Sequence, residues 1–488
     1  MPYRPARFDS GPLLSAADRH LVTRFSYGLT PKLVRDVKKA GNAKKWLRRQ
    51  LRPHQVRDRS PDVASWWSGL SRDPQSLWER SRDGVEGGWE VMADYQRYLL
   101  MRRIHSRHQV LEVMTEVWEN HFNVPVSGDL VYTWRKDYGD TVREHALGRF
   151  EDLLQAVVTH PAMLLYLDGA VSTKANPNEN LGRELLELHT LGRGTHTEDD
   201  VKASARILTG WKVARFTTFA ASYDKGDHWT GPVQVGDFSH PNADRDGREV
   251  TRAYLSYLAH HPATARRVAR RLAVKFVSDD PSDALVEKLA STYLDHDTAI
   301  KPVLMALVGT KEFRTSRGAK VRDPGEDVVA TYRVLRPRFS PPPEGGAGDK
   351  YAATAVMWQT RRIGQAPMDW PRPDGAPIDN ASWSSPARLT ASLDMHWSAA
   401  GRWWPGEGIR WRSPMQWMPR KRIRFDLLVD HMCQELLGKR SNRRLLEAAC
   451  QACQVRPREV IDKDHPVVRW RFHWLIGTLL DTPDHLTR

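Results

Sequence analysis

Cysteine is scarce in this sequence. Only three of its 488 residues are cysteines, and Cys433, Cys450 and Cys453 all lie near the C-terminus. Three thiols cannot form the disulfide framework of a small secreted protein, so a reducing compartment is expected. Cys450 and Cys453 make a single C-x-x-C in a helix-like run, without the second pair or the βαβ context of a zinc or redox site. We interpret them as small helix residues.

Long apolar runs are also missing. No stretch approaches the ~20 apolar residues that cross a bilayer, and the opening MPYRPARFDSGPLL lacks the ~7–15-residue apolar region of an export signal. We expect no membrane span and, by default, a cytoplasmic location. The sequence contains no G-x-S-x-G elbow, Walker loop or H-E-x-x-H. It therefore gives no support to a serine hydrolase, a P-loop NTPase or a zincin.

Basic residues exceed acidic ones. The chain has 74 Lys and Arg against 59 Asp and Glu, a formal net charge of +15. This excess invites a nucleic-acid hypothesis, but the arginines are scattered along predicted helices and no zinc-finger, basic-zipper or RRM pattern occurs. We predict no specific nucleic-acid partner, only weak binding that salt abolishes.

Apolar residues recur at three-to-four spacing through most of the chain, which predicts a mostly α-helical fold with a large multi-helix body. The segment 88–105 indicates a long amphipathic helix, and 110–122 indicates the next one. His160-Pro161 and His261-Pro262 place proline at a first helical position, and Thr197 with Asp200 form a capping-box pattern. Further helices are expected at 281–295, 300–308, 326–335, 424–438, 441–453 and 465–480.

The helical spacing of apolar residues gives way to strict alternation in one region of the chain. Alternating β-branched and aromatic residues predict a small β-hairpin insertion at about 211–238. Prolines and glycines predict a linker at 337–350. The expected organisation is a helical core over 1–336, this linker, and a Trp- and Pro-rich C-terminal region over 351–488, whose helices pack on the core.

Tryptophan is concentrated near the C-terminus. Ten of the 19 tryptophans lie between Trp358 and Trp474, and five of these fall within 396–417. Exposed rings beside arginines could stack on bases or sugars. We favour the alternative that a long, irregular loop over 364–417 uses the rings to attach itself to the body, or presents them to a protein partner.

The segment NENLGRELLELHTLG (178–192) gathers chemistry-bearing side chains. Glu179, Arg183 and Glu187 are four residues apart and therefore share one helix face. Glu184 lies on an adjacent stripe, and His189 follows near the helix end. Leucines fill the other positions, so this helix is expected to be central, with its charges paired.

Two interpretations of this segment remain open. A structural one makes the charges a salt-bridge ladder between helices. A functional one joins this cluster to Glu112, Asn120 and His121 of the earlier helix in a carboxylate and histidine pocket. In that pocket Glu184, Glu187 and His189 would be catalytic, and His121, Glu112, Glu184 and His189 would bind a divalent metal.

Asp227 and His228 are a second candidate for catalysis. They lie between two β-like segments, where a loop dyad can reach a substrate at the mouth of a helical body. A lone Asp-His pair is also common as an ordinary surface feature.

Five stretches together resemble the bacterial family catalogued as domain of unknown function 1800. They are AADRHLVTRFSYGLTP (16–31), LEVMTEVWENHF (111–122), NENLGRELLELHTLGRGTHTEDDVKASARILTGW (178–211), HPATARRVARRLAVKFVSDDP (261–281) and IGQAPMDWPRPDG (363–375). The resemblance runs from about residue 16 to about 400. His196 stands where many members have tyrosine, and Asp227-His228 reverses the His-Asp order common in the family.

The family name records no general activity. Our hypothesis is an enzyme with the inter-helix pocket as its active site and metal-assisted hydrolysis as its reaction. The alternative comes from the resemblance, which implies a phosphatase- or sulfatase-like partner of the domain-of-unknown-function 1501 family. In that case the chain is a non-catalytic helical partner, exported as a folded complex.

Overall fold

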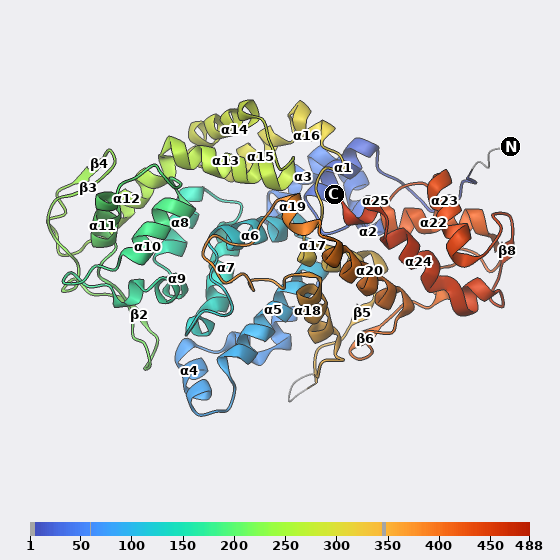
Figure 1. The fold of residues 1–488 in the computed structure, drawn as a ribbon, viewed down its shortest axis with the longest axis horizontal. Helices are drawn as coiled ribbons and strands as arrows, with labels where there is room; N and C mark the ends of the chain where they lie inside the picture. The colour runs from blue at the N-terminus through green and yellow to red at the C-terminus, as the bar shows by residue number, and fades with distance from the viewer. Residues whose placement is uncertain (1–4, 59, 344–347) are drawn as a thin grey trace.

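The computed structural model describes residues 5–58, 60–343 and 348–488. Helices dominate the fold, and its sheets are small antiparallel pairs of strands (Figure 1). The predicted mostly α-helical class is confirmed.

The first half of the chain forms one end and the middle of the molecule (Figure 1). Its helices are α1 (Ala16–Arg24), α2 (Pro31–Ala40), α3 (Ala43–Gln50), α4 (Pro74–Arg82), α5 (Gly88–His105), α6 (Gln109–His121), α7 (Arg135–His145), α8 (Phe150–Val158), α9 (Pro161–Tyr166), α10 (Glu179–Glu184), the π-helix η6 (Leu185–His189), α11 (Glu198–Ile207) and α12 (Arg248–His260). Short 3-10 turns occupy Pro53–Gln55, Val63–Trp66, Ser68–Ser71, Val131–Thr133 and Gly169–Val171.

The second half returns through the middle and builds the opposite end (Figure 1). Its helices are α13 (Pro262–Phe276), α14 (Asp283–Asp295), α15 (Ile300–Leu307), α16 (Lys311–Thr315), α17 (Pro324–Leu335), α18 (Ala352–Ile363), α19 (Asn380–Trp383), α20 (Pro386–Gly401), α21 (Pro414–Trp417), α22 (Phe425–Leu437), α23 (Arg443–Cys453), the π-helix η7 (Val467–Arg471), α24 (Phe472–Leu480) and α25 (Pro483–Leu486).

Helix starts follow the sequence signals. His160 and His261 are N-caps whose side chains accept from the backbone N–H two residues on, with proline at the first helical position. The Thr197 hydroxyl accepts from the N–H of Asp200, and the Asp200 carboxylate accepts from the N–H of Thr197. The predicted His-Pro starts and the capping box are confirmed.

The region predicted to hold one hairpin holds two. Strand β1 (Trp211–Val213) pairs with β2 (Ala221–Tyr223), and β3 (Val233–Val235) pairs with β4 (Phe238–His240). Glycines at 226 and 231 interrupt the alternation, so each pair stays short. Two further ladders join distant segments: β5 (Arg338–Phe339) with β6 (Ile409–Arg410), and β7 (Ile423–Arg424) with β8 (Val460–Ile461).

Helix α17 links the two clusters of buried apolar side chains that form the core. Its Val328 and Val329 belong to the larger cluster, whereas Val334 and Leu335 belong to the smaller one, which consists mainly of α22 to α24. The proposed division into a core, a linker and a C-terminal region stays a prediction, and residues 344–347 of the predicted linker lie outside the described residues.

The stretch 364–417 is only partly the predicted loop. Residues 364–379 are irregular, but α20 then runs for 16 residues. Ser385 caps it and Pro386 occupies its first position, the same kind of start signal that identified other helices.

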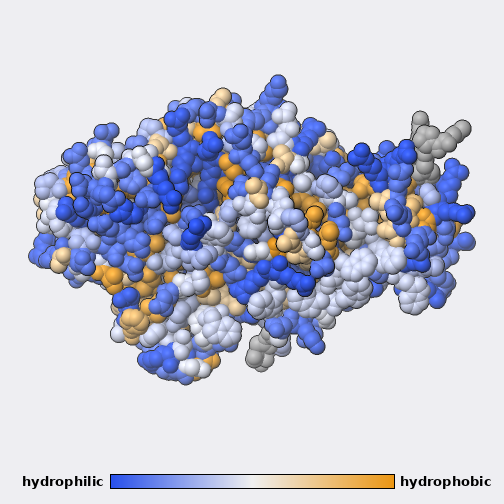
Figure 2. Space-filling model, viewed as in Figure 1, coloured by the Kyte–Doolittle hydropathy of each residue, from blue (hydrophilic) through white to orange (hydrophobic). Residues whose placement is uncertain are grey.

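The chain ends at the middle of the molecule (Figure 1). The backbone N–H of Arg488 donates to the carbonyl of Lys320 at 2.8 Å, and its guanidinium lies 2.6 Å from Glu326. Hydrophilic side chains cover much of the face in Figure 2, with apolar patches between them. Within the described ranges, no helix combines the length and apolar character that a bilayer crossing requires.

Candidate functional site

Helix α17 begins with three carboxylates. Asp323 is its N-cap and accepts from the N–H of Glu326 at 2.8 Å, and Pro324 occupies the first helical position. Acidic side chains are favourable there because the helix dipole is positive at its N-terminus. Asp323 lines a pocket, while the buried Glu326 and Asp327 contact basic side chains inside the protein.

The pocket lies between α6, α13, α17 and the loop 364–379, and contains about 610 Å³ of empty space including its open mouth. Five charged side chains line it: Arg103, Glu116, Arg271, Lys275 and Asp323. Apolar atoms of the loop complete the wall, so the charges are set in a partly apolar surface, as is common in ligand sites. We call this space the α17 pocket.

Four of the five charged groups have partners. Lys275 Nζ lies 2.9 Å from Glu326 and 3.4 Å from Asp323. Arg103 lies 3.6 Å from Glu116, and the Tyr27 hydroxyl donates to the same carboxylate. Oppositely charged groups at these distances hold one another in place.

Arg271 differs from the other four. Its Nε and one terminal nitrogen are buried and make no hydrogen bond to any part of the chain that the structure describes. Burial, together with the nearby Arg267 guanidinium, lowers the pKa of Arg271, although the Asp374 carboxylate acts in the opposite direction. Arg271 is half-buried, and its buried, unused donors carry a desolvation cost. An anion in the pocket would remove that cost.

Asp323 is placed to exchange protons. Burial, with the negative charges of Glu326 and Glu116, raises its pKa to about 6, although Lys275 acts in the opposite direction. A carboxyl group with a pKa near 6 is present in both protonation states close to neutral pH, which suits general acid–base work.

The loop 364–379 is fastened across α6. Asn120 donates to the carbonyl of Ala376 at 2.8 Å and accepts from its N–H at 2.6 Å. Asn123 donates to two further loop carbonyls, each at 2.8 Å. Gly375 has φ +73°, and a Cβ there would lie only 1.9 Å from the Asn120 carbonyl, so only glycine allows this close approach.

A second polar cluster lies inside the protein, also on α17. Asp327, His396 and His485 are buried, and each offers a ligand atom close to the other two. His396 Nε2 lies 3.2 Å from Asp327, and His485 Nε2 lies 3.9 Å from the same oxygen. We call these three residues the Asp-His-His group.

Surrounding groups orient this cluster. His396 donates from Nδ1 to Asp481 at 2.8 Å, and the other Asp327 oxygen accepts from Ser392 at 2.5 Å and Arg388 at 3.2 Å. These contacts hold the His396 pKa at about 9 despite burial, and lower that of Asp327. The protonated imidazole between two carboxylates is one stable state of this cluster.

The Asp-His-His group could hold a metal ion. One carboxylate and two imidazoles are common ligands of zinc and related divalent metals. The Nδ1 contact of His396 with Asp481 leaves Nε2 directed at the other two side chains, and such a carboxylate behind a ligating histidine is the usual outer support of a metal site.

A further group, Glu151, His260 and Asp297, also brings ligand atoms together. Arg149 forms ion pairs with Glu151 and, at 2.8 Å, with Asp297. The guanidinium already neutralises both carboxylates, so this group is an ion-pair network on a partly exposed surface.

The structure brings together two of the four residues predicted to bind metal. His121 donates to the carbonyl of His189 at 3.0 Å, and His189 donates to the carbonyl of His121 at 2.9 Å. Both rings are buried, and burial keeps the pKa of each well below its ordinary value. The paired histidines join the end of α6 to the end of η6.

Glu112 lies elsewhere. It is nine residues before His121 on α6, roughly 13 Å along the helix axis. Its two oxygens contact Arg102 at 2.7 Å and Arg143 at 2.8 Å, which lowers its pKa despite complete burial. Glu112 is therefore an internal counter-ion, away from the paired histidines.

Glu184 and Glu187 also lie apart from the histidines. Arg183 contacts Glu179 at 3.3 Å and Glu198 of α11 at 2.7 Å, with Glu187 at 3.9 Å. These side chains are partly exposed, so the predicted ladder exists on the surface and not in the core. A surface ladder contributes little to the free energy of unfolding. Burial and Glu187 raise the pKa of Glu184.

No hydrogen bond or ion pair links Glu184 or Glu187 to His121 or His189 among the residues that the structure describes. The two sets of side chains lie on different faces of the helix, because His189 is buried whereas Glu184 and Glu187 are partly exposed. The catalytic and metal roles assigned to these residues stay predictions.

Asp227 and His228 point to different neighbours. Asp227 pairs with Lys212 at 2.9 Å. His228 is buried, with Nε2 2.9 Å from the side-chain oxygen of Asn242 and Nδ1 3.1 Å from the carbonyl of Thr209. Within the described parts of the chain, Asp227 and His228 share no hydrogen-bond or ion-pair partner. The catalytic role of this pair also stays a prediction.

The fold and the α17 pocket define a mostly helical protein with a polar, partly apolar-walled site at its middle. The chain belongs to the family described as "Protein of unknown function (DUF1800)", whose model matches residues 20–487. This match includes the C-terminal helices that the sequence resemblance covered only weakly. Comparisons with curated proteins and with solved structures gave no match.

Three of the five family-like stretches meet at the α17 pocket. Residues 111–122 supply Glu116 and Asn120, 261–281 supply Arg271 and Lys275, and 363–375 supply Gln365 to Met368. Sequence reasoning missed this convergence because it weighed charges within one helix. A usable signal was present in Asp323-Pro-Gly-Glu-Asp327, a helix start with more carboxylates than capping needs.

Proposed function

We propose that the protein is an enzyme and that the α17 pocket is its active site, where a substrate with an anionic group is hydrolysed by acid–base catalysis. The observation that carries the proposal is Arg271, a guanidinium at the pocket wall whose buried donors find no acceptor among the described residues. A buried donor without an acceptor is uncommon in folded proteins, and one at the wall of a pocket can gain an acceptor from a ligand.

Arg271 would bind the anionic group. A guanidinium offers several N–H donors in a planar arrangement that matches carboxylate, phosphate or sulfate oxygens. Lys275 and Arg103 are close by but already face Glu326 and Glu116, so they would add positive potential rather than direct bonds.

Asp323 would act on water. In its ionised form it takes one proton from a water molecule as the water oxygen attacks the substrate, and the bond to the leaving group breaks. The proton then passes from Asp323 to the leaving group, which restores the carboxylate. The backbone N–H of Glu326 donates to the Oδ1 atom of Asp323 at 2.8 Å. This hydrogen bond fixes the orientation of the carboxyl group.

The replacement Asp323→Asn tests the catalytic role. Asparagine caps helices as well as aspartate does, so α17 should keep its start while the proton carrier is lost. Rates with a panel of chromogenic phosphate, sulfate and carboxylate esters should fall about 10²- to 10⁴-fold for any ester that the wild type hydrolyses. Asp73→Asn, at the exposed N-cap of α4, is the matched control and should retain wild-type rates.

Two results would contradict the proposal. One is a wild-type protein that hydrolyses no ester of the panel above the uncatalysed rate. The other is an Asp323→Asn protein with undiminished activity and the same unfolding midpoint as the wild type.

A second proposal concerns the Asp-His-His group, which we infer to be a divalent-metal site that supports the first turn of α17. The donor set and the Asp481 contact to His396 favour it. His485→Ala should lower the metal content measured by elemental analysis of protein purified without chelator or nickel. The exposed His54→Ala should not, and wild-type protein without stoichiometric metal after zinc dialysis would refute the idea.

A partner remains a separate prediction. Trp397 and Trp403 are exposed, and each ring packs edge-on against His473, which forms an aromatic surface of the kind that interfaces use. Coexpression with a phosphatase- or sulfatase-like protein should yield a complex that Trp403→Ala weakens. If no complex forms, the binding alternative fails.

A further inference from the structure

A cleft at the end of α17 gathers four arginines. Arg336, Arg338, Arg410 and Arg412 line it together with Trp411 and Gln416. Arg336 ends α17, and the others lie on or directly after the β5 and β6 strands. We call this space the arginine cleft. It lies apart from the α17 pocket, and the two share no lining residue.

The ladder between β5 and β6 places two of these cations face to face. Arg338 is directly opposite Arg410, and Phe339 is directly opposite Ile409. The second pair packs against the core, so the arginine pair is on the outer face, where both side chains are exposed. Like charges directly opposite on paired strands destabilise the ladder.

Among the described residues, a single carboxylate faces this cluster. Glu435 forms an ion pair with Arg336 and lies 3.8 Å from a terminal nitrogen of Arg412, too far for a hydrogen bond. That Arg412 nitrogen and the Nε of Arg336 are buried and have no hydrogen-bond acceptor among the described residues. Burial, with Arg336 nearby, lowers the pKa of Arg412.

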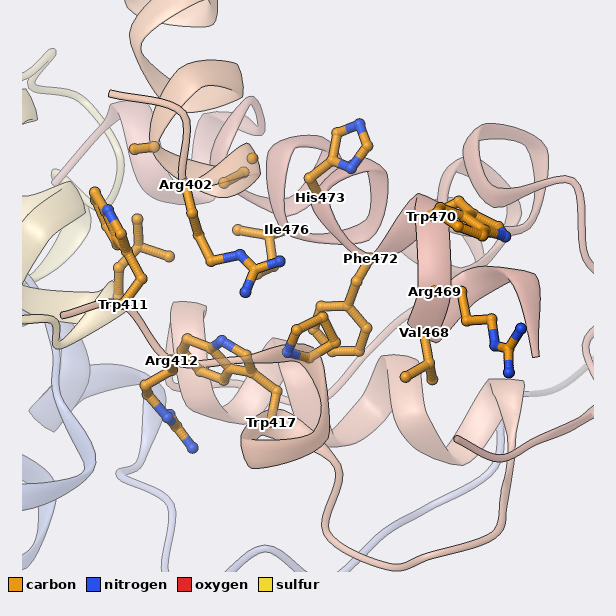
Figure 3. Close-up of a pocket in the computed structure, with 15 residues that line it drawn as sticks. Arg402, Trp411, Arg412, Trp417, Val468, Arg469, Trp470, Phe472, His473 and Ile476 are labelled. Atoms are coloured by element: carbon orange, nitrogen blue, oxygen red, sulfur yellow. The ribbon is translucent and has the colours of Figure 1, made fainter. Parts of the chain in front are cut away.

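An aromatic pocket adjoins the cleft and shares Trp411 and Arg412 with it. In Figure 3 the rings of Trp411, Trp417 and Phe472 surround the space, and the Arg402 side chain extends into it. Arg412 stacks on Trp417, with 3.7 Å between the guanidinium carbon and the ring centroid. Flat apolar walls of this kind suit a planar ring.

We propose that the arginine cleft binds the phosphate groups of an aromatic phosphorylated compound, whose ring enters the adjoining aromatic pocket. Phosphate oxygens accept several hydrogen bonds. Their negative charge would offset the repulsion between Arg338 and Arg410. The unused donors on Arg336 and Arg412 gain acceptors in the same step.

Calorimetric titration with pyrophosphate and with ADP tests this proposal. Both probes should bind the wild type saturably, ADP more tightly, and binding should weaken as salt rises. The double replacement Arg338→Gln with Arg410→Gln should weaken both at least tenfold. The same comparison is repeated in an Arg271→Met background, which removes the anion-binding guanidinium of the α17 pocket. Binding that persists there and is lost with the double replacement belongs to the arginine cleft.

A chemical denaturation curve provides the control for folding. Without ligand, the double replacement should unfold at the same or a higher denaturant concentration than the wild type, because two facing cations are removed. Absence of saturable binding, or equal binding by the double variant, overturns the proposal. If ADP binds no more tightly than pyrophosphate, the proposal that the ligand's ring enters the aromatic pocket is contradicted.

Discussion

His121 and His189 each donate a hydrogen bond from the imidazole ring to the other's backbone carbonyl, at 3.0 and 2.9 Å. The two residues are 68 positions apart, and together they clamp α6 to η6 in a fully buried setting. The two histidines act as structural hydrogen-bond donors. They provide partners for the carbonyls of His121 and His189, because the last carbonyls of a helix have no partner within the helix.

We predict that His189→Ala destabilises the protein by about 2–4 kcal/mol, because it removes a buried hydrogen bond, leaves the His121 carbonyl without its partner and opens a cavity. The free energy of unfolding from denaturant titration measures the effect. His54→Ala, at an exposed position, should change it by less than about 0.5 kcal/mol. Equal stability of the two variants would show that the clamp contributes nothing.

The same clamp should make stability depend on pH. Burial lowers the pKa of His189 from 6.5 to about 3, so its neutral form is favoured in the folded state. Its contribution is therefore complete above pH 6.5 and is lost progressively as the pH falls from 6.5 toward 3. Denaturation midpoints should drop between pH 7 and pH 4, and the His189→Asn variant should show a smaller drop. A parallel drop in both proteins would assign the acid sensitivity to other groups.

Asp327 should be essential to folding. It is buried and contacts His396 at 3.2 Å and Arg388 at 3.2 Å, so Asp327→Asn leaves Arg388 without its carboxylate and His396 with Asp481 as its remaining counter-ion. We expect a loss of about 3–5 kcal/mol, measured by denaturation. Asp199→Asn changes a carboxylate that is 93% exposed and should have almost no effect, as expected for a surface ion pair.

Gly375 should control the loop over the α17 pocket. A Cβ at this position would collide with the Asn120 carbonyl, so Gly375→Ala should displace the loop and expose the pocket. Limited proteolysis should then cut within 364–379 at a higher rate. Gly406→Ala has no neighbour within 4 Å and should be cut like the wild type. Equal protection of both variants would show that the loop does not need this contact.

Much of the fold could be predicted because apolar periodicity and caps are local signals. The segment 88–105 was predicted as one helix and is α5, with the same bounds. The second hairpin was missed because strands of three residues give too few alternations to recognise. The helix α20 was hidden by the tryptophans and prolines around it, although Ser385-Pro386 marks its start.

The candidate site was harder to predict because it is built from distant segments. Asp327 and His396 are 69 residues apart, and no spacing rule relates them. The charged face of 178–192 resembled a site since its residues are close in sequence, yet His189 is buried while Glu184 and Glu187 are partly exposed on another face. The stretch 363–375 was recognised as family-like, but only the fold places it over Arg271 and Asp323.

The central claim is that Arg271 serves a ligand rather than the fold, and the free energy of unfolding of Arg271→Met tests it most directly. Methionine fills similar space without charge, and the guanidinium donors it removes have no acceptor within the described chain. The account predicts stability equal to or above that of the wild type, as for residues kept at a cost for function. A loss of about 3–5 kcal/mol, the penalty for breaking a buried ion pair, would contradict it.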